Sequence, residues 1–550
     1  MQWKDILEIL LFALPLLLLA PRFGYWLAHR LDQEQPTNFE YNFFKFFGFR
    51  FGPQTAKEYF KDLLIFHLLG LLAFFLIIYG IRLATEPMSW HLALNTAVSF
   101  ITNTNWQAYS GEVSLAPLMQ MLAPTVQNFL SAATGMAVMF ALIRGLRNKD
   151  SNTVGNYWLD LFRSIGYVLL PLSIFLAFIL MSQGVVQTFD SVINYVTLEG
   201  QHAQLQLGPV ASQLAIKQLG TNGGGHFGVN SAHPFENPTA LSNYLQLVAI
   251  LFLPIALVFT YGEMLGRRKH AWTIFSVMAS IYGIGIVVSL LAEHSSNPAL
   301  QGMPFLEGKE WRFGKTASIL WSTATTAASN GSVNAMHSSL SPIAGMVALF
   351  NILLGEIIFG GVGAGMYGMV IFILLTLFLC GLMVGRTPEY LGKKIEAYDM
   401  KLVLLALIAP SCTVLIGTLL SLVTDVGLSS RSTSGPHGLS EVLYAWGSAS
   451  NNNGSAFAGL NANTIFYNVG LSIAMLIGRF GVIFPVLWLA QSFSKKKILA
   501  GNAGQMSIES WMFGFLLFSI IAIVGALTFF PSLLLGPVLE HLLMLRAHVM

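Results

Sequence analysis

The stretch ASQLAIKQLGTNGGG, residues 211–225, decides the fold because it joins an apolar segment too short to cross a membrane to a polar, glycine-rich cluster. Segments of about 10–14 apolar residues are typical of re-entrant helices. The arrangement occurs four times, with the short segments at His91–Thr102, Ser212–Gly220, Thr316–Ala328 and Leu439–Ser450. Comparable positions in the four clusters lie about 115 residues apart, which indicates an internal repeat.

The composition places the chain in lipid. Of 550 residues, 54% are hydrophobic and 10% are charged, whereas a soluble protein carries about 25% charged residues. Apolar stretches long enough for the ~30 Å hydrocarbon core recur from end to end. Only Lys4 precedes the first stretch and Asp5 offsets it, so we expect a retained span and not a cleaved signal. The predicted spans are 4–28, 58–84, 116–145, 156–183, 240–266, 271–294, 342–385 (broken), 399–424, 461–493 and 508–535.

We therefore predict an all-α membrane protein with ten transmembrane helices. Four helix–pore loop–helix repeats would surround a pseudo-fourfold pore, as in potassium channels and related potassium transporters. The predicted division is a first transmembrane helix (1–30), four pore repeats (58–146, 156–268, 271–386 and 399–494) and a last transmembrane helix with an outer tail (508–550).

The basic residues gather in the loops after the odd-numbered spans, and few lie in the loops between. Lys and Arg are retained on the cytoplasmic side of a membrane, so we expect these loops inside and both termini outside. The residues are Arg30, Lys45, Arg50, Lys57, Lys61, Arg144, Arg147, Lys149, Arg163, Arg267, Arg268, Lys269, Arg386, Lys393, Lys394, Lys401, Lys495, Lys496 and Lys497.

The loop tips suit a small cation, with potassium the best candidate. They read TNTNW (102–106), TNGGG (221–225), SNGS (329–332) and NNNGS (451–455), and none is acidic. A divalent cation would favour carboxylates, whereas neutral backbone carbonyls can replace the water of a monovalent ion. Gly and Asn tolerate the dihedrals that turn neighbouring carbonyls the same way. The C-terminal ends of the short helices would add partial negative charge.

Long stretches of the chain resemble KdpA, the potassium-binding subunit family of the bacterial Kdp potassium-transporting P-type ATPase. The resemblance implies a subunit of the bacterial inner membrane that selects extracellular potassium for a high-affinity import complex and hydrolyses no ATP. A separate catalytic P-type subunit would use ATP and magnesium, two small accessory subunits would complete the complex, and no further cofactor or nucleic acid would bind. The stretches are LALNTAVSFITNTNWQAYSGE (92–112), TVQNFLSAATGMAV (125–138), LGTNGGGHF (219–227), HPFENPTAL (233–241), TTAASNGSVNAMH (325–337), FGGVGAGMYGM (359–369), GRTPEYLGKK (385–394), GPHGLSEVLYA (435–445), NNNGSAFAGL (451–460) and GRFGVI (478–483).

The resemblance also implies the ion-binding residues and a supporting residue, Gln107, beside the filter. Asn105 stands where the other loops have Gly, and Asn330 stands where we expect a small residue such as Cys. The implied ion-binding residues are Asn103, Thr104, Asn105, Thr221, Asn222, Gly223, Ser329, Asn330, Gly331, Asn452, Asn453 and Gly454.

Four further features have two interpretations each. Gly360, Gly361, Gly363 and Gly365 would break the seventh span and by resemblance form a gate at the inner pore; otherwise they are a small-residue packing surface. Arg386 would lie near the inner end of the ion path, or be a topogenic charge. The intramembrane carboxylate Glu356 would be functional or a paired structural group. His226 would compete with the ion if protonated, but we expect it to be solvated.

The sequence shows little sign of cysteine chemistry, ATP hydrolysis or nucleotide binding. The cysteines Cys380 and Cys412 lie in apolar stretches, no Asp lies in an Asp-Lys-Thr-Gly setting, and the P-loop-like segment 308–316 has one residue too many. A stand-alone potassium channel or potassium-coupled symporter remains the rival interpretation. An intramembrane enzyme would need a nucleophile–base pair or a metal cluster, and the sequence suggests neither.

Overall fold

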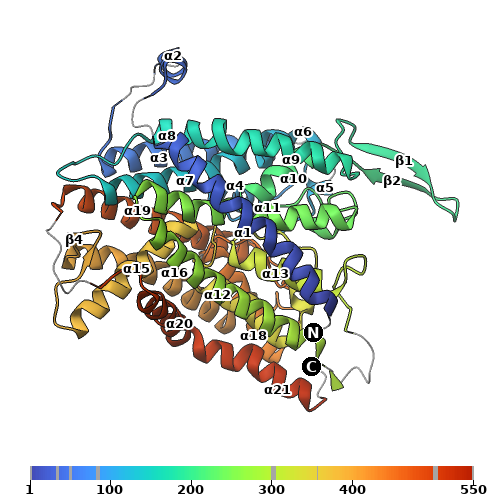
Figure 1. Ribbon diagram of the computed structural model, residues 1–550. Helices are drawn as coiled ribbons and strands as arrows, with labels where there is room; N and C mark the ends of the chain where they lie inside the picture. Colours follow the sequence, from blue (N-terminus) through green and yellow to red (C-terminus); the bar gives the residue numbers. More distant parts are fainter. Residues whose placement is uncertain are drawn as a thin grey trace.

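The computed structural model describes residues 3–32, 36–46, 48, 52–81, 87–295, 297–298, 305–355, 357–498 and 506–547. Arg50 and Glu356, both singled out from the sequence, lie outside these residues. The described chain is helical apart from two short β-hairpins, and ten of its helical segments are long and apolar enough to span a membrane (Figure 1). This confirms the predicted class of a multi-pass helical membrane protein.

The last helix runs further than predicted, and the seventh span, predicted as broken over 342–385, is a helix that begins at Ala364. The other predicted bounds agree to within a few residues with those of the ten observed spans. They are α1 (Trp3–Leu31), α3 with η1 (Ala56–Phe75, Leu76–Gly80), α6, η2 and α7 (Pro117–Gln120, Met121–Thr125, Val126–Arg147), α8, η3 and α9 (Tyr157–Arg163, Ser164–Leu169, Leu170–Ser182), α11 (Ala240–Met264), α12 (Arg268–His294), α15 (Ala364–Met383), α16 (Ala397–Val423), α19 (Ile465–Lys495), and α20, η7 and α21 (Trp511–Leu533, Leu534–Val538, Leu539–Leu545).

Hydroxyl side chains begin several of the spans. Thr55, Thr239, Thr464 and Ser510 each accept a hydrogen bond from a backbone N–H in the first turn of the helix that follows. Such N-caps satisfy donors that the first helical turn leaves unpaired. The predicted break in the seventh span is also present, because α14 (Pro342–Leu353) ends before the glycine run and α15 begins within it.

Four shorter helices lie between the spans, at the places where re-entrant helices were predicted. They are α4 (Trp90–Ile101), α10 (Val210–Leu219), α13 (Gly314–Ala327) and α18 (Gly435–Ser450). Each one is mostly buried and ends at a polar loop tip. We refer to them as the pore helices, and to the tips 102–106, 220–225, 328–332 and 451–455 as loops 1 to 4.

The remaining elements are short. Strand β1 pairs antiparallel with β2 in the register Val192↔Gln206 to Val196↔His202, and this hairpin projects from the helical body (Figure 1). The bounds of all the short elements are α2 (Asn38–Phe46), α5 (Gly111–Ser114), β1 (Val192–Val196), β2 (His202–Gln206), η4 (Asn230–Ala232), η6 (His337–Ser339), β3 (Glu389–Tyr390), β4 (Lys393–Lys394) and α17 (Asp425–Leu428).

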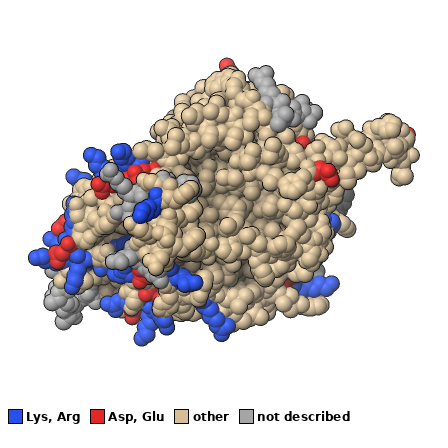
Figure 2. Space-filling view, turned by 90° about the horizontal axis from the view of Figure 1, so that it is seen from above, with Lys and Arg blue, Asp and Glu red and all other residues tan. Residues whose placement is uncertain are grey.

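The spans differ in how much of their surface is covered. Helices α7 and α11 are the most buried, whereas α1 and α3 present most of their apolar surface outward, as lipid-facing helices do. Most Lys and Arg side chains gather at one end of the molecule (Figure 2). Both chain ends lie at the opposite end, away from β4 (Figure 1).

Candidate ion filter

Each pore helix ends with the same backbone hydrogen bond. The N–H of the middle residue of each loop donates to the carbonyl oxygen five residues earlier, in the last turns of the helix. This bond closes the helix end and turns the chain into the loop. The four bonds join Thr104 to Ser99, Asn222 to Lys217, Asn330 to Thr325 and Asn453 to Ser448, at 2.8–2.9 Å.

All four loops share an unusual backbone conformation. Two residues with left-handed φ flank one residue without it, which is an alternation expected where successive carbonyl oxygens face one side of the chain. Glycine adopts left-handed φ without strain and Asn tolerates it better than most other residues. The flanking residues are Asn103 (63°) and Asn105 (55°), Thr221 (48°) and Gly223 (90°), Ser329 (49°) and Gly331 (87°), and Asn452 (50°) and Gly454 (93°).

Three glycines show that the loops surround a common centre. A Cβ atom added to Gly223 would lie 1.8 Å from the carbonyl oxygen of Asn330, in the next loop. A Cβ on Gly331 would lie 2.2 Å from Asn453 O, and one on Gly454 would lie 1.9 Å from Thr104 O. Loop 2 therefore abuts loop 3, loop 3 abuts loop 4, and loop 4 abuts loop 1. A side chain at any of these glycines would displace a carbonyl of its neighbour.

Side-chain amides and hydroxyls tie each loop to the neighbouring loop or to the pore helix that precedes it. Every junction of the ring carries at least one such hydrogen bond, so the ring is closed by side chains as well as by backbone packing. The bonds are Asn103 Nδ2 to Thr221 O (3.1 Å), Asn222 Nδ2 to Asn103 Oδ1 (2.6 Å), Asn330 Nδ2 to Lys217 O (3.1 Å), Ser329 Oγ to Asn451 O (3.0 Å), Asn453 Nδ2 to Thr325 O (3.0 Å) and Asn452 Nδ2 to Thr104 Oγ1 (2.9 Å).

Gln107 joins loop 1 to loop 2 at the edge of the ring. Its Oε1 accepts from the N–H of Gly225 at 2.8 Å, and its Nε2 donates to the Gly225 carbonyl at 3.1 Å and to the Tyr109 hydroxyl at 3.1 Å. The side chain is half-buried. The structure therefore places Gln107 beside the ring, bonded to loop 2.

The two residues that depart from the expected pattern are both accommodated. Asn105 donates from its side chain to Asn128 Oδ1 on α7 at 2.6 Å, and the same side chain lies against Gly224 of loop 2. Asn330 accepts from the N–H of Ser332 at 3.0 Å, and Asn453 makes the same bond to Ser455. Asn330 thus follows the pattern of loop 4. Asn128 was not singled out from the sequence, because an amide within an apolar span carries no motif of its own.

The ring offers neutral oxygen atoms only. Its twelve candidate residues are buried, apart from the half-buried Gly454, and none is ionisable. Within the described residues, no group of three or more His, Cys, Asp or Glu side chains could hold a metal ion. Backbone carbonyls in a small ring suit a dehydrated monovalent cation and lack the negative charge that a divalent cation favours.

His226, just after loop 2, was expected to be solvated, and this prediction is wrong. The side chain is 2% exposed and its Nδ1 lies 3.3 Å from Gln213 Oε1. Burial lowers the pKa of His226 to about 4. The imidazole is therefore neutral near pH 7 and does not compete with a cation at the ring.

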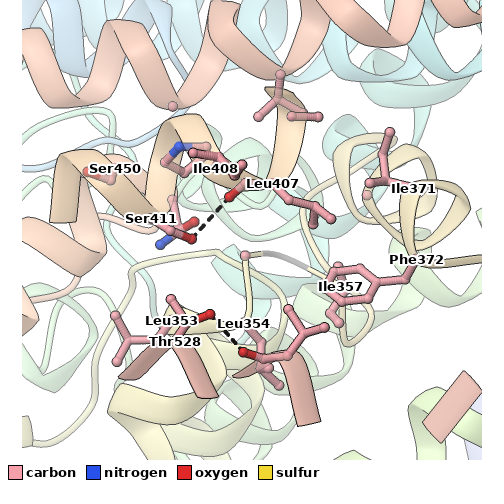
Figure 3. Close-up of a pocket in the computed structure, with 18 of the residues that line it drawn as sticks. Leu353, Leu354, Ile357, Ile371, Phe372, Leu407, Ile408, Ser411, Ser450 and Thr528 are labelled. Atoms are coloured by element: carbon pink, nitrogen blue, oxygen red, sulfur yellow. Dashed lines mark hydrogen bonds between the residues drawn. The ribbon is translucent and has the colours of Figure 1, made fainter. Parts of the chain in front are cut away.

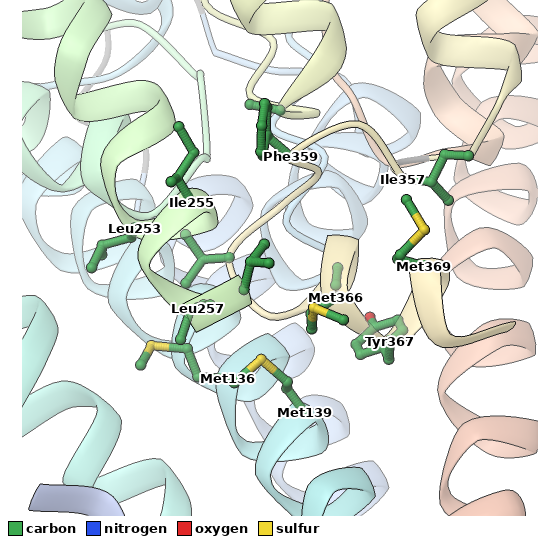
Figure 4. Packing of buried hydrophobic residues seen from close by; sticks show 14 of the residues in the cluster. Met136, Met139, Leu253, Ile255, Leu257, Ile357, Phe359, Met366, Tyr367 and Met369 are labelled. Carbon is green, nitrogen blue, oxygen red and sulfur yellow. The ribbon is translucent and has the colours of Figure 1, made fainter. Parts of the chain in front are cut away.

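The glycine run lies directly behind loop 2. The N–H of Val362 donates to Thr221 Oγ1 at 2.9 Å, which links the run to a candidate ion-binding residue. Gly363 has φ 83°, and its Cβ would lie 2.2 Å from the carbonyl oxygen of Gly135 on α7. Buried apolar side chains from α7, α11 and α15 surround the segment (Figure 4). Gly360, Gly361 and Gly363 lie in one buried loop, and Gly365 lies against Gly360 from the first turn of α15.

Arg386 lies elsewhere. It is exposed on the turn after α15 and follows the twenty-residue length of that helix, which separates it from the glycine run by about 30 Å. The structure therefore does not bring Arg386 to the ring or to the glycine run.

A cavity of about 510 Å³ lies between loop 4, the segment after α14, and helices α15, α16, α19 and α20 (Figure 3). Asn451 and Asn452 line its end at the ring, and most other lining residues are apolar. Lining residues Leu404 and Ile408 are also exposed on the surface, so the cavity reaches the side of the molecule.

Arg479 on α19 also lines the cavity, although the sequence prediction did not single it out. It is 4% exposed and donates to Ser131 O at 2.8 Å. A charged residue inside a predicted span is by itself a signal of function, and that rule would have found it.

Comparisons with known proteins identify the family of the chain. The sequence model of the family described as "Potassium-transporting ATPase A subunit", KdpA, matches residues 10–542. The chain belongs to the KdpA family.

Several KdpA relatives are similar over nearly their whole length. A "Potassium-transporting ATPase potassium-binding subunit" of Leptospira interrogans is 52% identical over 98% of both chains. Proteins of the same description from Sorangium cellulosum and Yersinia pestis are 51% and 50% identical; the first match covers 89% of both chains, and the second covers 99% of this chain and 100% of its relative. The solved structure of the potassium transporter TrkH from Vibrio parahaemolyticus matches 90% of this chain and all of its own, with a TM-score of 0.55 at 15% identity. The fold is therefore shared with TrkH.

Proposed function

We propose that this chain is the potassium-selecting subunit of an ATP-driven potassium import complex, and that loops 1 to 4 hold the ion. The observation that carries the proposal is the ring itself. Four loops share one left-handed backbone pattern, and each of three glycines abuts a carbonyl of the next loop. Such a ring presents several carbonyl oxygens to one point, which is the arrangement that replaces the hydration shell of potassium.

The pore helices also favour a cation at the ring. Each one ends at its loop, so its C-terminal partial negative charge faces the ring. This field needs no titratable group, and the site would hold its charge preference across a wide pH range. Irregular backbone at membrane depth is tolerated only where it is buried in protein or lines a cavity.

The chemistry that uses ATP and magnesium is assigned to a separate catalytic subunit of the complex, with two small accessory subunits beside it. The relatives are described as the potassium-binding subunit of a potassium-transporting ATPase, which supports this division of labour. The only cofactor-like ligand on this chain would be potassium itself, as cargo. The glycine run behind Thr221 would bound the inner side of the site, and Arg386 would lie near the surface where the catalytic subunit docks.

The complex would lie in the bacterial inner membrane with the basic end of this chain in the cytoplasm. The gathering of Lys and Arg at one end supports this orientation (Figure 2). Both termini, at the opposite end, would then face outside. Potassium would enter the ring from the side of the pore helices.

The decisive experiment separates an ion-selecting subunit from a stand-alone channel or symporter. The complex is purified from its host, and ATP hydrolysis is measured against potassium concentration. The proposal predicts hydrolysis that rises with potassium and saturates. In parallel, this chain alone is reconstituted in liposomes and potassium flux is measured without ATP. Sustained flux through the lone chain, with no potassium stimulation of the complex, would overturn the proposal in favour of a channel.

A further inference from the structure

A buried lysine lies in the last turn of the second pore helix. Lys217 in α10 is fully buried, and its backbone carbonyl accepts from the N–H of Asn222 in loop 2 and from the Asn330 side chain in loop 3. The equivalent residues of the other pore helices are Ser99, Thr325 and Ser448. Only repeat 2 thus has a cationic side chain at this position. A positive charge so close to a cation site would oppose binding unless it were balanced.

The Lys217 ammonium has three acceptors. They are Glu236 Oε2 at 2.5 Å, Asn230 Oδ1 at 2.5 Å and Ser231 Oγ at 2.8 Å, which match the three donors of an ammonium group. The second oxygen of Glu236 accepts from the backbone N–H groups of His226 at 2.7 Å and Phe227 at 3.0 Å. The charge is therefore balanced locally, and the carboxylate also holds the chain just after loop 2.

Asn230 connects this ion pair to loop 2. While its Oδ1 accepts from Lys217, its Nδ2 donates to the carbonyl oxygen of Gly223 at 2.7 Å. Asn230 has a left-handed φ of 55°, which Asn tolerates. A cation at the amide oxygen polarises the amide and strengthens its N–H as a donor. One side chain thus links the ammonium to a carbonyl of the candidate filter.

We propose that Lys217, Asn230 and Glu236 form a positioning relay that fixes the direction of the Gly223 carbonyl and so sets the ion preference of the ring. The inference rests on the proposed function, namely that the ring binds potassium. A buried ion pair adds little net stability compared with apolar residues of the same size, so support of the fold alone would not require these charges. Because the other three repeats have uncharged residues at the position of Lys217, the relay acts on one side of the ring only.

The relay is tested in the purified complex by potassium-stimulated ATP hydrolysis, repeated with rubidium and sodium. Glu236→Gln leaves the Lys217 charge unbalanced. We expect the half-saturating potassium concentration to rise about tenfold, equivalent to about 1.4 kcal/mol, and the preference for potassium over the other ions to fall. The maximal rate is expected to stay within about twofold, because the relay is proposed to act on ion binding and not on ATP hydrolysis itself.

The chain offers a matched control. Glu293 forms a buried ion pair with Lys309 at 2.9 Å, with both side chains as buried as those of Lys217 and Glu236. The side chains of this pair are hydrogen-bonded to the backbone of Ser339 and Ser341, not to a loop of the ring. Glu293→Gln breaks an equivalent ion pair, and we expect its half-saturating potassium concentration and ion preference to match those of the wild type.

Two further variants separate positioning from general damage. Asn230→Gly keeps the left-handed backbone and the ion pair but removes the bond to Gly223, so ion preference should fall without any change of charge. This variant decides the question even if Glu236→Gln does not assemble. Lys217→Met combined with Glu236→Gln removes both charges and should recover part of the affinity lost in Glu236→Gln. Wild-type ion preference in Asn230→Gly, or equal shifts in Glu236→Gln and Glu293→Gln, would overturn the relay while a potassium-stimulated wild-type complex still upheld the proposed function. A wild-type complex without potassium stimulation would overturn both.

Discussion

The Gly223→Ala substitution tests the ring through a single methyl group. Gly223 has φ 90°, and a Cβ at this position would lie 1.8 Å from the carbonyl oxygen of Asn330. Because Cβ contacts under 3.0 Å essentially do not occur, the carbonyl or the loop must move by about 1.2 Å. Both groups belong to the candidate ion site, so the displacement falls on the atoms that would bind potassium.

The expected effect has two parts. Alanine in the left-handed region costs roughly 1–2 kcal/mol relative to glycine, and this part affects stability. A misplacement of about 1 Å in a preorganised site can cost about 100-fold in function, so we expect the half-saturating potassium concentration to rise about 100-fold, equivalent to about 2.7 kcal/mol. The second part is specific to potassium.

The assay is potassium-stimulated ATP hydrolysis by the purified complex, with Gly200→Ala as the matched control. Gly200 also has a left-handed φ of 80°, but nothing lies within 4 Å of its Cβ position. The control therefore carries the backbone cost without the collision, and its potassium dependence should equal that of the wild type. Equal potassium dependence in Gly223→Ala and Gly200→Ala would refute the ring.

Three other substitutions test the surroundings of the ring. Gln107→Arg removes the acceptor of the Gly225 N–H and adds a positive charge, so we expect the half-saturating potassium concentration to rise at least about tenfold. The rise should be larger than in the uncharged Gln107→Met, and equal rises in the two variants would argue against charge repulsion. Thr221→Val leaves the buried Val362 N–H without its acceptor, which costs about 1–3 kcal/mol of stability. Potassium-stimulated activity should fall several-fold in Thr221→Val and be retained in Thr221→Ser. Equal activities of these two variants would contradict the link between loop 2 and the glycine run. Burial lowers the pKa of His226 to about 4. Neutral His226 therefore stabilises the fold fully above about pH 6.5 and loses this effect as the pH falls toward 4. The thermal unfolding temperature of the wild type should fall more than that of His226→Gln between pH 6.5 and 4, and equal falls would show that His226 titrates normally.

The spans and pore helices were predictable because lipid imposes strong constraints on sequence. Apolar length predicts spans, and the short segment 212–220 beside a polar tip predicts a re-entrant helix. The break at Gly360 to Gly365 was predictable from the cost of glycine in a helix. Most of the left-handed conformations at loops 1 to 4 follow from their Gly and Asn content, but those of Thr221 and Ser329 do not. The ring order needed the three-dimensional contacts of Gly223, Gly331 and Gly454.

The side chains behind the ring were harder to predict, because their roles depend on partners distant in sequence. Asn128 meets Asn105 only when α7 packs behind loop 1, and Glu236 meets Lys217 only when the segment after loop 2 folds back. The burial of His226 has the same origin, since Gln213 and the Gly208 backbone enclose its ring. Arg386 lies far from the ring because the whole length of α15 separates it from the glycine run, and the sequence motif around Arg386 did not show this distance.

The central claim is that potassium binds inside a ring made by all four loops. The most direct measurement is a high-resolution structure of the intact complex with thallium or rubidium in place of potassium, in which the heavy ion can be located. The account predicts ion density at the centre of the ring, within coordinating distance of backbone oxygens from loops 1, 2, 3 and 4. Ion density only outside the ring, or coordinated by side chains distant from these loops, would contradict it.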